Sequence, residues 1–359
     1  MRESMLMLLT TTLLGSVRTR TNDLTSIRTR TNDLPATTVF SAGLANISCF
    51  RIPSIVRTPA GALVAFAEAR HGSCGDGNVY EIAYRRSTDD GATWSDVGFA
   101  VGNSSFRVGN PTAVATVAGD IVLVYVTHNH GKTGDPGSGT GIVTSADGGL
   151  TWSAPRDIST GFGVASGALP GPGTALQLAG PVVPAGRLLV VSHLGAYQKD
   201  YVSYSDDLGG TWTTVDHPFP SMDEAQLAQL PNGSVYLNMR HRDSPSKGRG
   251  VALSDDGGET WGPIRYDAAL ISPVCQASVA TIGRTVYFSN PDSTSARANI
   301  TIKASDDSAA TWSRDLLVEA AASAGYSCLV QSGVSSTRGG ILFEAVGTTI
   351  AYAEFPLEW

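Results

Sequence analysis

Charged residues are scarce in this chain of 359 residues, making up 16% of it, and basic residues are the minority among them. The 25 Lys and Arg face 32 Asp and Glu, which leaves a formal net charge of −7. A broad basic surface of the kind that binds nucleic acid or anionic membranes is therefore not expected, although a local basic site is compatible with this balance. No apolar run approaches the roughly 20 residues of a membrane-spanning helix, so no membrane span is predicted.

Cysteine is also rare, with four residues in the whole chain, Cys49, Cys74, Cys275 and Cys328. This number is too small for a disulfide scaffold, and no pair has the C-x-x-C spacing of a zinc site, so we expect no metal and no cofactor. One or two disulfides suit an oxidising compartment, but the sequence does not separate the three possible two-bridge connectivities. Glycosylation sequons begin at Asn46, Asn103, Asn232 and Asn299, in keeping with a secretory route.

The first 36 residues differ from the rest. A short apolar stretch, Met5 to Leu14, follows Arg2 and precedes Gly15 and Ser16, which is the pattern of a weak signal peptide. The polar segment SVRTRTNDLT at 16–25 is nearly repeated as SIRTRTNDLP at 26–35, without the periodicity of a core-forming element. We therefore predict a signal peptide and disordered leader over 1–36 and one folded domain over 37–359, in a secreted or lysosomal protein.

An internal repeat organises the folded part. Four segments read S-x-D-x-G-x-T-W, and a fifth has Ala309 in place of the glycine; they start at Ser87, Ser145, Ser205, Ser254 and Ser305. These starts are 58, 60, 49 and 51 residues apart, the length of a four-stranded propeller blade. Each copy follows a β-rich run, so we expect it in a turn where Asp accepts backbone N–H groups, Gly takes a positive φ and Trp packs between strands. The repeat predicts an all-β, six-bladed β-propeller, closed by an N-terminal strand near residues 38–44.

These repeats resemble the Asp-boxes of sialidases, and Phe50-Arg51-Ile52-Pro53 resembles the FRIP motif of that family. The segments LVAFAEARHGSCGDG, PGPGTALQL, LPNGSVYLNMR and VYFSNPDSTSARANITIK look most similar to the animal lysosomal type. The resemblance covers residues 37–359. It implies an exo-α-sialidase that removes terminal sialic acid from glycoproteins, glycolipids or oligosaccharides, with a role in ganglioside catabolism. A sialylated glycan is then the expected partner, and a carboxypeptidase-like protective protein is a second candidate.

The resemblance also assigns the substrate-binding residues. By it, the carboxylate of the sugar is held by three arginines, Arg51, Arg240 and Arg297. Arg70 corresponds to a fourth site arginine beside the acid/base loop, and Glu344 to the glutamate that orients Arg51. The chemistry fits these types, because guanidinium groups bind a carboxylate through two parallel hydrogen bonds and stay charged at any relevant pH.

The same resemblance identifies Asp76 as the acid/base, Tyr326 as the nucleophile and Glu224 as its partner. Because Asp223 adjoins Glu224, the alignment leaves room for a slip of one acidic residue. Sialic acid carries its carboxylate on the anomeric carbon, so a carboxylate nucleophile would meet like charge, whereas a neutral tyrosine does not. A phenol titrates near pH 10 and needs a base to take its proton, and sialidases are the tyrosine exception among glycosidases.

Three other functions compete with this interpretation. An inactive sialic-acid-binding propeller would need only the arginines, so the complete catalytic set favours an enzyme. A scaffold or sorting propeller would have the boxes without the FRIP and LNMR arginines. A trans-sialidase would differ in how its aglycone site excludes water, which the sequence does not reveal. Asn110, Gln177 and His193 fall in segments that resemble pocket-lining loops.

Overall fold

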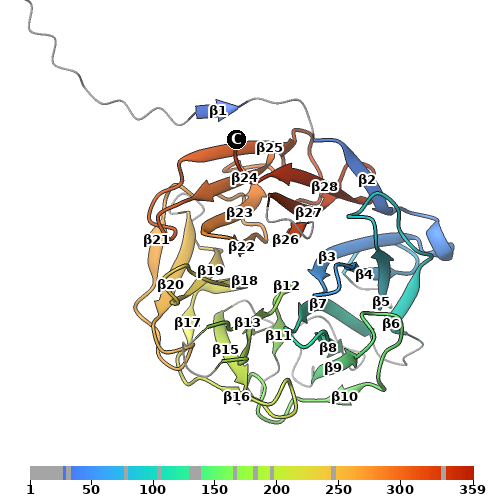
Figure 1. Cartoon of the computed structure of the whole chain (residues 1–359), viewed down its shortest axis with the longest axis horizontal. Coiled ribbons are helices and arrows are strands. Elements are labelled where there is room, and N and C mark those ends of the chain that lie inside the picture. The colour runs from blue at the N-terminus through green and yellow to red at the C-terminus, as the bar shows by residue number, and fades with distance from the viewer. Residues whose placement is uncertain are drawn as a thin grey trace, which may run out of the picture.

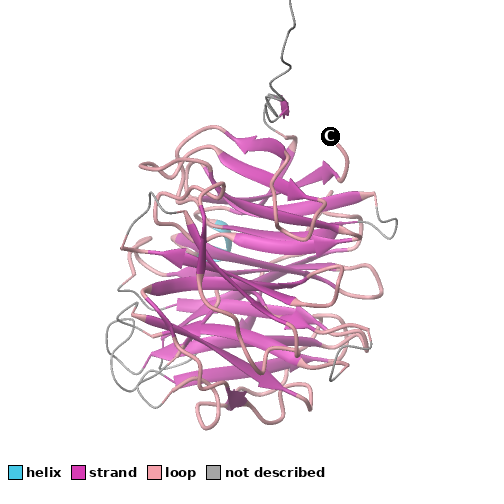
Figure 2. Cartoon of the chain, turned by 90° about the vertical axis from the view of Figure 1, so that its left-hand side faces the viewer, coloured by secondary structure: helices cyan, strands magenta, loops and turns pink. Residues whose placement is uncertain are grey.

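The computed structural model of the chain describes residues 27–29, 34–76, 80–102, 107–128, 139–164, 168–180, 185–194, 198–243, 248–332 and 337–359. Their strands form six sheets around a central axis, which is the six-bladed β-propeller that the repeat predicts (Figure 1). Among these residues the regular structure is strand, apart from one short 3-10 helix, η1 (Leu44–Asn46) (Figure 2). None of the helices in this part of the chain has the length and apolar character to cross a bilayer.

Each blade runs outward from the axis through antiparallel strands. In the first blade these are β3 (Cys49–Arg57), β4 (Leu63–Arg70), β5 (Tyr80–Ser87) and β6 (Gly98–Val101). The second contains β7 (Arg107–Ala115), β8 (Ile121–His128), β9 (Gly139–Ser145) and β10 (Arg156–Asp157), with β12 (Gly173–Thr174) beside β7. The third contains β11 (Leu169–Pro170), β13 (Leu176–Gln177), β14 (Leu188–His193), β15 (Lys199–Ser205), β16 (Thr213–Thr214) and β17 (Phe219–Pro220).

The remaining three blades have the same plan. The fourth contains β18 (Met222–Gln229), β19 (Val235–His241), β20 (Arg249–Ser254) and β21 (Arg265–Asp267). The fifth contains β22 (Ser278–Ile282), β23 (Thr285–Pro291), β24 (Ile300–Ser305) and β25 (Arg314–Glu319). The sixth contains β26 (Ser327–Ser332), β27 (Arg338–Ala345), β28 (Thr349–Pro356) and β2 (Ala36–Phe40).

The ring closes as predicted, because β2 from the N-terminal part of the chain pairs with β28 from its C-terminal end. Within the expected leader, β1 (Ile27–Thr29) lies outside the ring and pairs in parallel with β25 (Figure 1). The predicted signal peptide and the rest of the decapeptide repeat before residue 34 lie outside the described residues.

The five boxes form the same hydrogen-bonded turn. In the first, Asp89 accepts the backbone N–H of Thr93 at 2.9 Å and its hydroxyl at 2.5 Å, while Gly91 N–H donates to Ser87 Oγ at 2.8 Å. The glycine of this turn has φ 89°, and Ala309, its counterpart in the fifth box, has φ 62°. The degraded box therefore keeps the turn, with an alanine in the left-handed region that glycine favours.

The box tryptophans fill the seams between blades. Trp152 packs against Phe66 of the preceding blade at 5.5 Å between ring centroids, and Trp94 packs against Tyr352 of the sixth blade at 5.7 Å. Such edge-on aromatic contacts add to the burial of large apolar surfaces. The local turn of each box thus also joins its blade to a neighbour.

The strand registers place the boxes and the predicted site at opposite ends of the propeller. Leu63 of β4 pairs with both Arg57 at the end of β3 and Ser87 at the start of the first box. The box therefore lies at the end of the blade where the inner strand β3 finishes. Arg51, near the beginning of β3, lies at the other end.

Candidate active site

A polar pocket of about 260 Å³ lies where the inner strands begin, and five arginines and three carboxylates line it. Two apolar residues, Ile52 and Leu169, also line the pocket. Its polar lining residues are Arg51, Glu68, Arg70, Asp76, Asn110, His193, Glu224, Arg240, Arg242, Arg297 and Tyr326. A larger cavity of about 620 Å³ is lined by later residues of the same inner strands, and Arg57 is the charged residue in its lining. Because the titratable groups gather in the smaller pocket, that pocket is the candidate site.

Irregularities in three inner strands shape this pocket. The pairing of β3 shifts between Arg51 and Ser54, that of β7 between Gly109 and Thr112, and that of β18 on either side of Glu224. Within the first two irregular segments, Ile52 has φ 60° and Asn110 has φ 51°. A positive φ is a strained conformation for a β-branched residue, and bulges of this kind redirect side chains next to functional sites.

The three predicted clamp arginines surround one aromatic ring. The guanidinium carbon of Arg51 lies 5.2 Å from the centroid of the Tyr326 ring, and that of Arg297 lies 5.5 Å from it. Arg240 comes from the other direction, with Nη1 3.4 Å from Tyr326 Oη. Arg297 is also fixed by a hydrogen bond to the carbonyl of Ala324 at 2.9 Å. The three guanidinium groups therefore surround Tyr326, although they come from three different blades.

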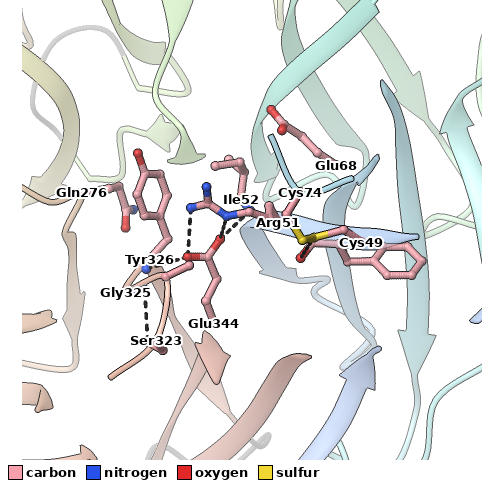
Figure 3. A network of polar contacts seen from close by, with 12 residues as sticks. Cys49, Arg51, Ile52, Glu68, Cys74, Gln276, Ser323, Gly325, Tyr326 and Glu344 are labelled. Atoms are coloured by element: carbon pink, nitrogen blue, oxygen red, sulfur yellow. Dashed lines mark hydrogen bonds and ion pairs between the residues drawn. A yellow bond between two sulfur atoms is a disulfide. The ribbon is translucent and has the colours of Figure 1, made fainter. Parts of the chain in front are cut away.

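Glu344 of β27 connects the first and sixth blades. Its Oε1 accepts Arg51 Nε at 2.9 Å and the backbone N–H of Ile52 at 3.0 Å, and its Oε2 accepts the backbone N–H of Tyr326 at 3.0 Å (Figure 3). Burial disfavours the charge of Arg51, but the charge and hydrogen bond of Glu344, together with smaller effects of Tyr326 and Glu68, outweigh this and raise the pKa of Arg51 above its ordinary value. The contact that the sequence expected between Glu344 and Arg51 is present.

Tyr326 is paired with Glu224 rather than with Asp223. Tyr326 Oη donates to Glu224 Oε1, and Arg240 Nη1 donates to Glu224 Oε2. Asp223 is fully buried behind the pocket and binds Arg242 Nη1 at 2.9 Å. Burial, reinforced by the charge of Glu224, raises the pKa of Tyr326 well above its ordinary value, so the phenol is neutral at rest. Of the two adjacent acids, Glu224 is therefore the one that contacts the Tyr326 hydroxyl.

Asp76 lies on the exposed side of the pocket. Its side chain is 77% exposed, and Oδ1 accepts Arg70 Nη1 at 2.7 Å. Arg70 is itself buried and bound by Glu68, with Nε to Oε2 at 2.9 Å and Nη2 to Oε2 at 2.6 Å. The other carboxylate oxygen of Glu68 accepts the backbone N–H of Asn110 at 2.8 Å. This chain of contacts links β4 to the loop of Asp76 and to β7.

Sequence reasoning missed Glu68 and Arg242. The alternation in LVAFAEAR places Glu68 on the same face of β4 as Arg70, and this was the available signal. Of the three residues in segments that resemble pocket-lining loops, Asn110 and His193 line the pocket, whereas Gln177 lines the larger cavity at the opposite end of the inner strands. Burial lowers the pKa of His193, which favours a neutral imidazole.

The four cysteines form one disulfide and leave two free thiols. Cys49 and Cys74 form a disulfide, while Cys275 and Cys328 are free and buried. Burial raises the pKa of Cys275 to about 12, so this thiol beside Tyr326 stays protonated. Within the described ranges, no group of three His, Cys, Asp or Glu side chains could hold a metal ion.

Comparison with known proteins agrees with this fold. The model of a family described as BNR repeat-like domain matches residues 61–337. A sialidase of Micromonospora viridifaciens is 33% identical over 350 residues, covering 86% of this chain and 52% of that protein. The solved structure of the Hadza microbial sialidase Hz136 superposes with a TM-score of 0.81 and 29% identity, covering 90% of this chain and 68% of that one.

Similarity to animal proteins is not distinctive. Human Sialidase-4 is 30% identical over 271 residues, covering 64% of this chain and 54% of that protein, so a bacterial relative matches over a larger share. The comparisons therefore support the family and not the animal lysosomal subtype that the sequence segments indicated. The chain spans about half the length of these curated relatives.

Proposed function

This chain belongs to the sialidase family built on BNR repeats, and from that premise we propose that it is an exo-α-sialidase acting with retention of configuration. Its substrate class would be glycoproteins, glycolipids or oligosaccharides that end in sialic acid. One observation carries the proposal. Three arginines converge on a buried tyrosine whose hydroxyl donates to a glutamate, in a pocket that also contains an exposed aspartate.

The arginines suit the carboxylate that sialic acid bears on its anomeric carbon. Each guanidinium offers parallel N–H donors, and three of them around Tyr326 would hold the carboxylate with the anomeric carbon above the phenol oxygen. Glu344 would keep Arg51 in its binding rotamer before substrate arrives. Cations crowded in one pocket repel each other, and the buried carboxylates of Glu344 and Glu224 offset part of that cost.

In the first step, Tyr326 Oη would form a bond to the anomeric carbon as the bond to the glycosidic oxygen breaks. The phenol proton passes to Glu224, and Asp76 gives its own proton to the departing oxygen. The raised pKa of Tyr326 makes this base necessary, because the free phenol does not ionise near neutral pH.

In the second step, water would displace Tyr326 from the anomeric carbon. Asp76, now a carboxylate, takes a proton from the water, and Glu224 returns the phenol proton to Tyr326. The enzyme is restored, and two inversions leave free sialic acid in the α configuration. Asp76 is exposed toward the solvent side of the pocket, where both the leaving alcohol and the incoming water would lie.

Two alternatives share this pocket. A binding protein without activity would use the arginines, but it would not need Glu224 beside Tyr326 or Asp76 beside Arg70. A trans-sialidase would use the same catalytic residues and pass the sugar to another hydroxyl. We favour hydrolysis because the open, solvent-exposed position of Asp76 suits activation of water.

The cellular setting rests on the sequence interpretation alone. We propose secretion or delivery to the lysosome, on the basis of the weak signal peptide pattern and the sequons. Ganglioside catabolism and a carboxypeptidase-like protective partner belong to the lysosomal form of that proposal. Co-purification of such a carboxypeptidase with the tagged chain from its own cells would test the partner.

The test of activity is fluorophore release from 4-methylumbelliferyl α-sialoside by the purified chain between pH 3.5 and 7.5, with products identified by mass spectrometry. We expect free sialic acid. Saturable binding of a sialoside without release would identify a binding protein, and a sialylated acceptor or an anhydro sugar as the main product would identify a transferase.

A further inference from the structure

One disulfide connects the arginine clamp to the loop of Asp76. Cys49 is the first residue of β3, two residues before Arg51, and Cys74 lies two residues before Asp76. Figure 3 shows the bond beside Arg51. The disulfide is not required to hold the two strands together, because Cys49 already pairs with Arg70 in the ladder between β3 and β4. The disulfide therefore restrains the loop after β4, which presents Asp76.

Most residues of this loop lie at the surface. His71, Gly72, Ser73, Gly75 and Asp76 are all exposed, so no buried side chain of theirs anchors the loop to the core. Gly72 takes φ 87°, a conformation that costs glycine little.

The noncovalent contacts of the loop are polar and lie mostly at the surface. Gly72 N–H donates to Ser48 Oγ at 3.0 Å, and Arg107 Nη1 donates to the carbonyl of Asp76 at 3.3 Å. Arg70 Nη1 donates to the carbonyl of Cys74 and to Asp76 Oδ1. Exposed hydrogen bonds compete with water and contribute little to local order. The disulfide is thus the covalent restraint on this loop, beside the hydrogen bonds that the buried Arg70 donates to it.

We propose that the Cys49–Cys74 disulfide positions Asp76 as the proton donor, so that leaving-group protonation depends on this bond while sugar binding and tyrosine attack do not. The inference rests on the proposed function. A catalytic group displaced by about 1 Å can lose on the order of 100-fold in rate, and a glycine-containing loop held by polar contacts alone would allow such a displacement. Independently of the loop, Glu344 holds Arg51, the carbonyl of Ala324 holds Arg297 and Glu224 holds Arg240.

The effect should depend on the leaving group. A sialoside of an alkyl alcohol, such as sialyllactose, needs protonation of its glycosidic oxygen, whereas an aryl sialoside with an acidic phenol does not. When Cys49→Ser and Cys74→Ser are combined, we expect kcat/KM for sialyllactose to fall by about 10- to 100-fold. The value for 4-nitrophenyl α-sialoside should change by less than about threefold, because binding and attack are intact.

Reduction of the folded wild-type enzyme gives the same test without substitution. A water-soluble phosphine breaks the S–S bond, both sulfur atoms take up protons, and the phosphine becomes its oxide with oxygen from water. Cys74 is partly exposed, and both cysteines line a cavity of about 360 Å³ that admits a small reagent. Reduction should lower sialyllactose turnover in the wild type and leave the double serine variant unchanged.

Two controls separate positioning from general destabilisation. In an Asp76→Asn background, loss of the disulfide should cause no further loss on sialyllactose, because both changes act through one group. The matched control Cys328→Ala removes a buried core thiol away from the loop and should leave the ratio of the two substrate rates unchanged.

The outcomes are distinct. If the oxidised wild type cleaves neither substrate, the proposed function is wrong and the inference falls with it. If the wild type cleaves both, but the double serine variant and the reduced enzyme lose both activities equally or lose neither, the disulfide does not position Asp76. A selective loss on sialyllactose that disappears in the Asp76→Asn background supports the proposal.

Discussion

Glu344 holds Arg51 through two hydrogen bonds, from Nε to Oε1 at 2.9 Å and from Nη2 to Oε2 at 3.2 Å. The same carboxylate accepts the backbone N–H groups of Ile52 and Tyr326. A single buried side chain therefore sets the distance between a clamp arginine and the tyrosine it faces. The pair joins the first blade to the sixth, so blade closure and site geometry depend on the same contact.

Replacing this carboxylate by an amide should damage both stability and catalysis. In Glu344→Gln, the partly buried Arg51 loses its counter-ion, and one N–H group that Glu344 accepts loses its acceptor, which should cost about 3 kcal/mol of unfolding free energy. Denaturant unfolding measures this, and kcat/KM for an α-sialoside should fall in parallel. The pair Arg338–Glu354 provides the control, since replacing its half-exposed arginine in Arg338→Gln should cost less than about 1 kcal/mol.

Arg297→Lys should weaken sugar binding without disturbing the fold. A lysine ammonium is a point charge and cannot hold both the carbonyl of Ala324 and two carboxylate oxygens, so we expect affinity for sialic acid to fall by about 10- to 100-fold. Calorimetric titration measures this affinity. Arg265→Lys, on the exposed outer strand β21, is the control and should bind normally. Unchanged affinity in Arg297→Lys would remove Arg297 from the clamp.

The stereochemistry of the product tests the catalytic pair directly. Attack by Tyr326 followed by water on the same face requires α-sialic acid as the first product, which then converts to the β form. Proton NMR recorded during turnover distinguishes the two anomers. Tyr326→Phe should abolish this route even for aryl sialosides, since it has no attacking oxygen, whereas Asp76→Asn should keep part of its activity on them. Early β-sialic acid would contradict the double displacement.

The fifth box offers a test of backbone strain. Ala309 has φ 62°, so Ala309→Gly should raise the unfolding free energy by up to about 1 kcal/mol, after the greater chain entropy of glycine is subtracted. The reverse change in an intact box, Gly91→Ala, should destabilise the protein, because its Cβ would lie 2.2 Å from the Tyr352 ring. Thermal unfolding of the two variants measures both. A lower melting temperature for Ala309→Gly would show that packing of the methyl group outweighs the strain.

The sequence by itself determined the architecture. Each box encodes its turn within eight consecutive residues, in which Ser, Asp and Thr are connected by hydrogen bonds and Gly or Ala lies in the left-handed region. The spacing of the blades can therefore be read from the sequence without tertiary information. The closing strand was also predictable, since the repeat period over residues 37–359 accommodates about six blades and the N-terminal segment can supply the strand that closes the last one. Local interactions of this kind depend little on the rest of the chain.

The site depended on contacts between residues far apart in the chain, which only the tertiary structure decides. Arg51 and Glu344 are separated by 293 positions, and no local pattern identifies them as partners without a family resemblance. Adjacent acids at 223 and 224 are equivalent in sequence, but an irregularity in β18 directs Glu224 to Tyr326 and leaves Asp223 buried behind it. The disulfide was equally undetermined, because the pairing of Cys49 with Cys74 depends on the register that brings the start of β3 beside the end of β4. Burial and strand register, set by packing across whole blades, are the physical quantities that a list of residue types does not contain.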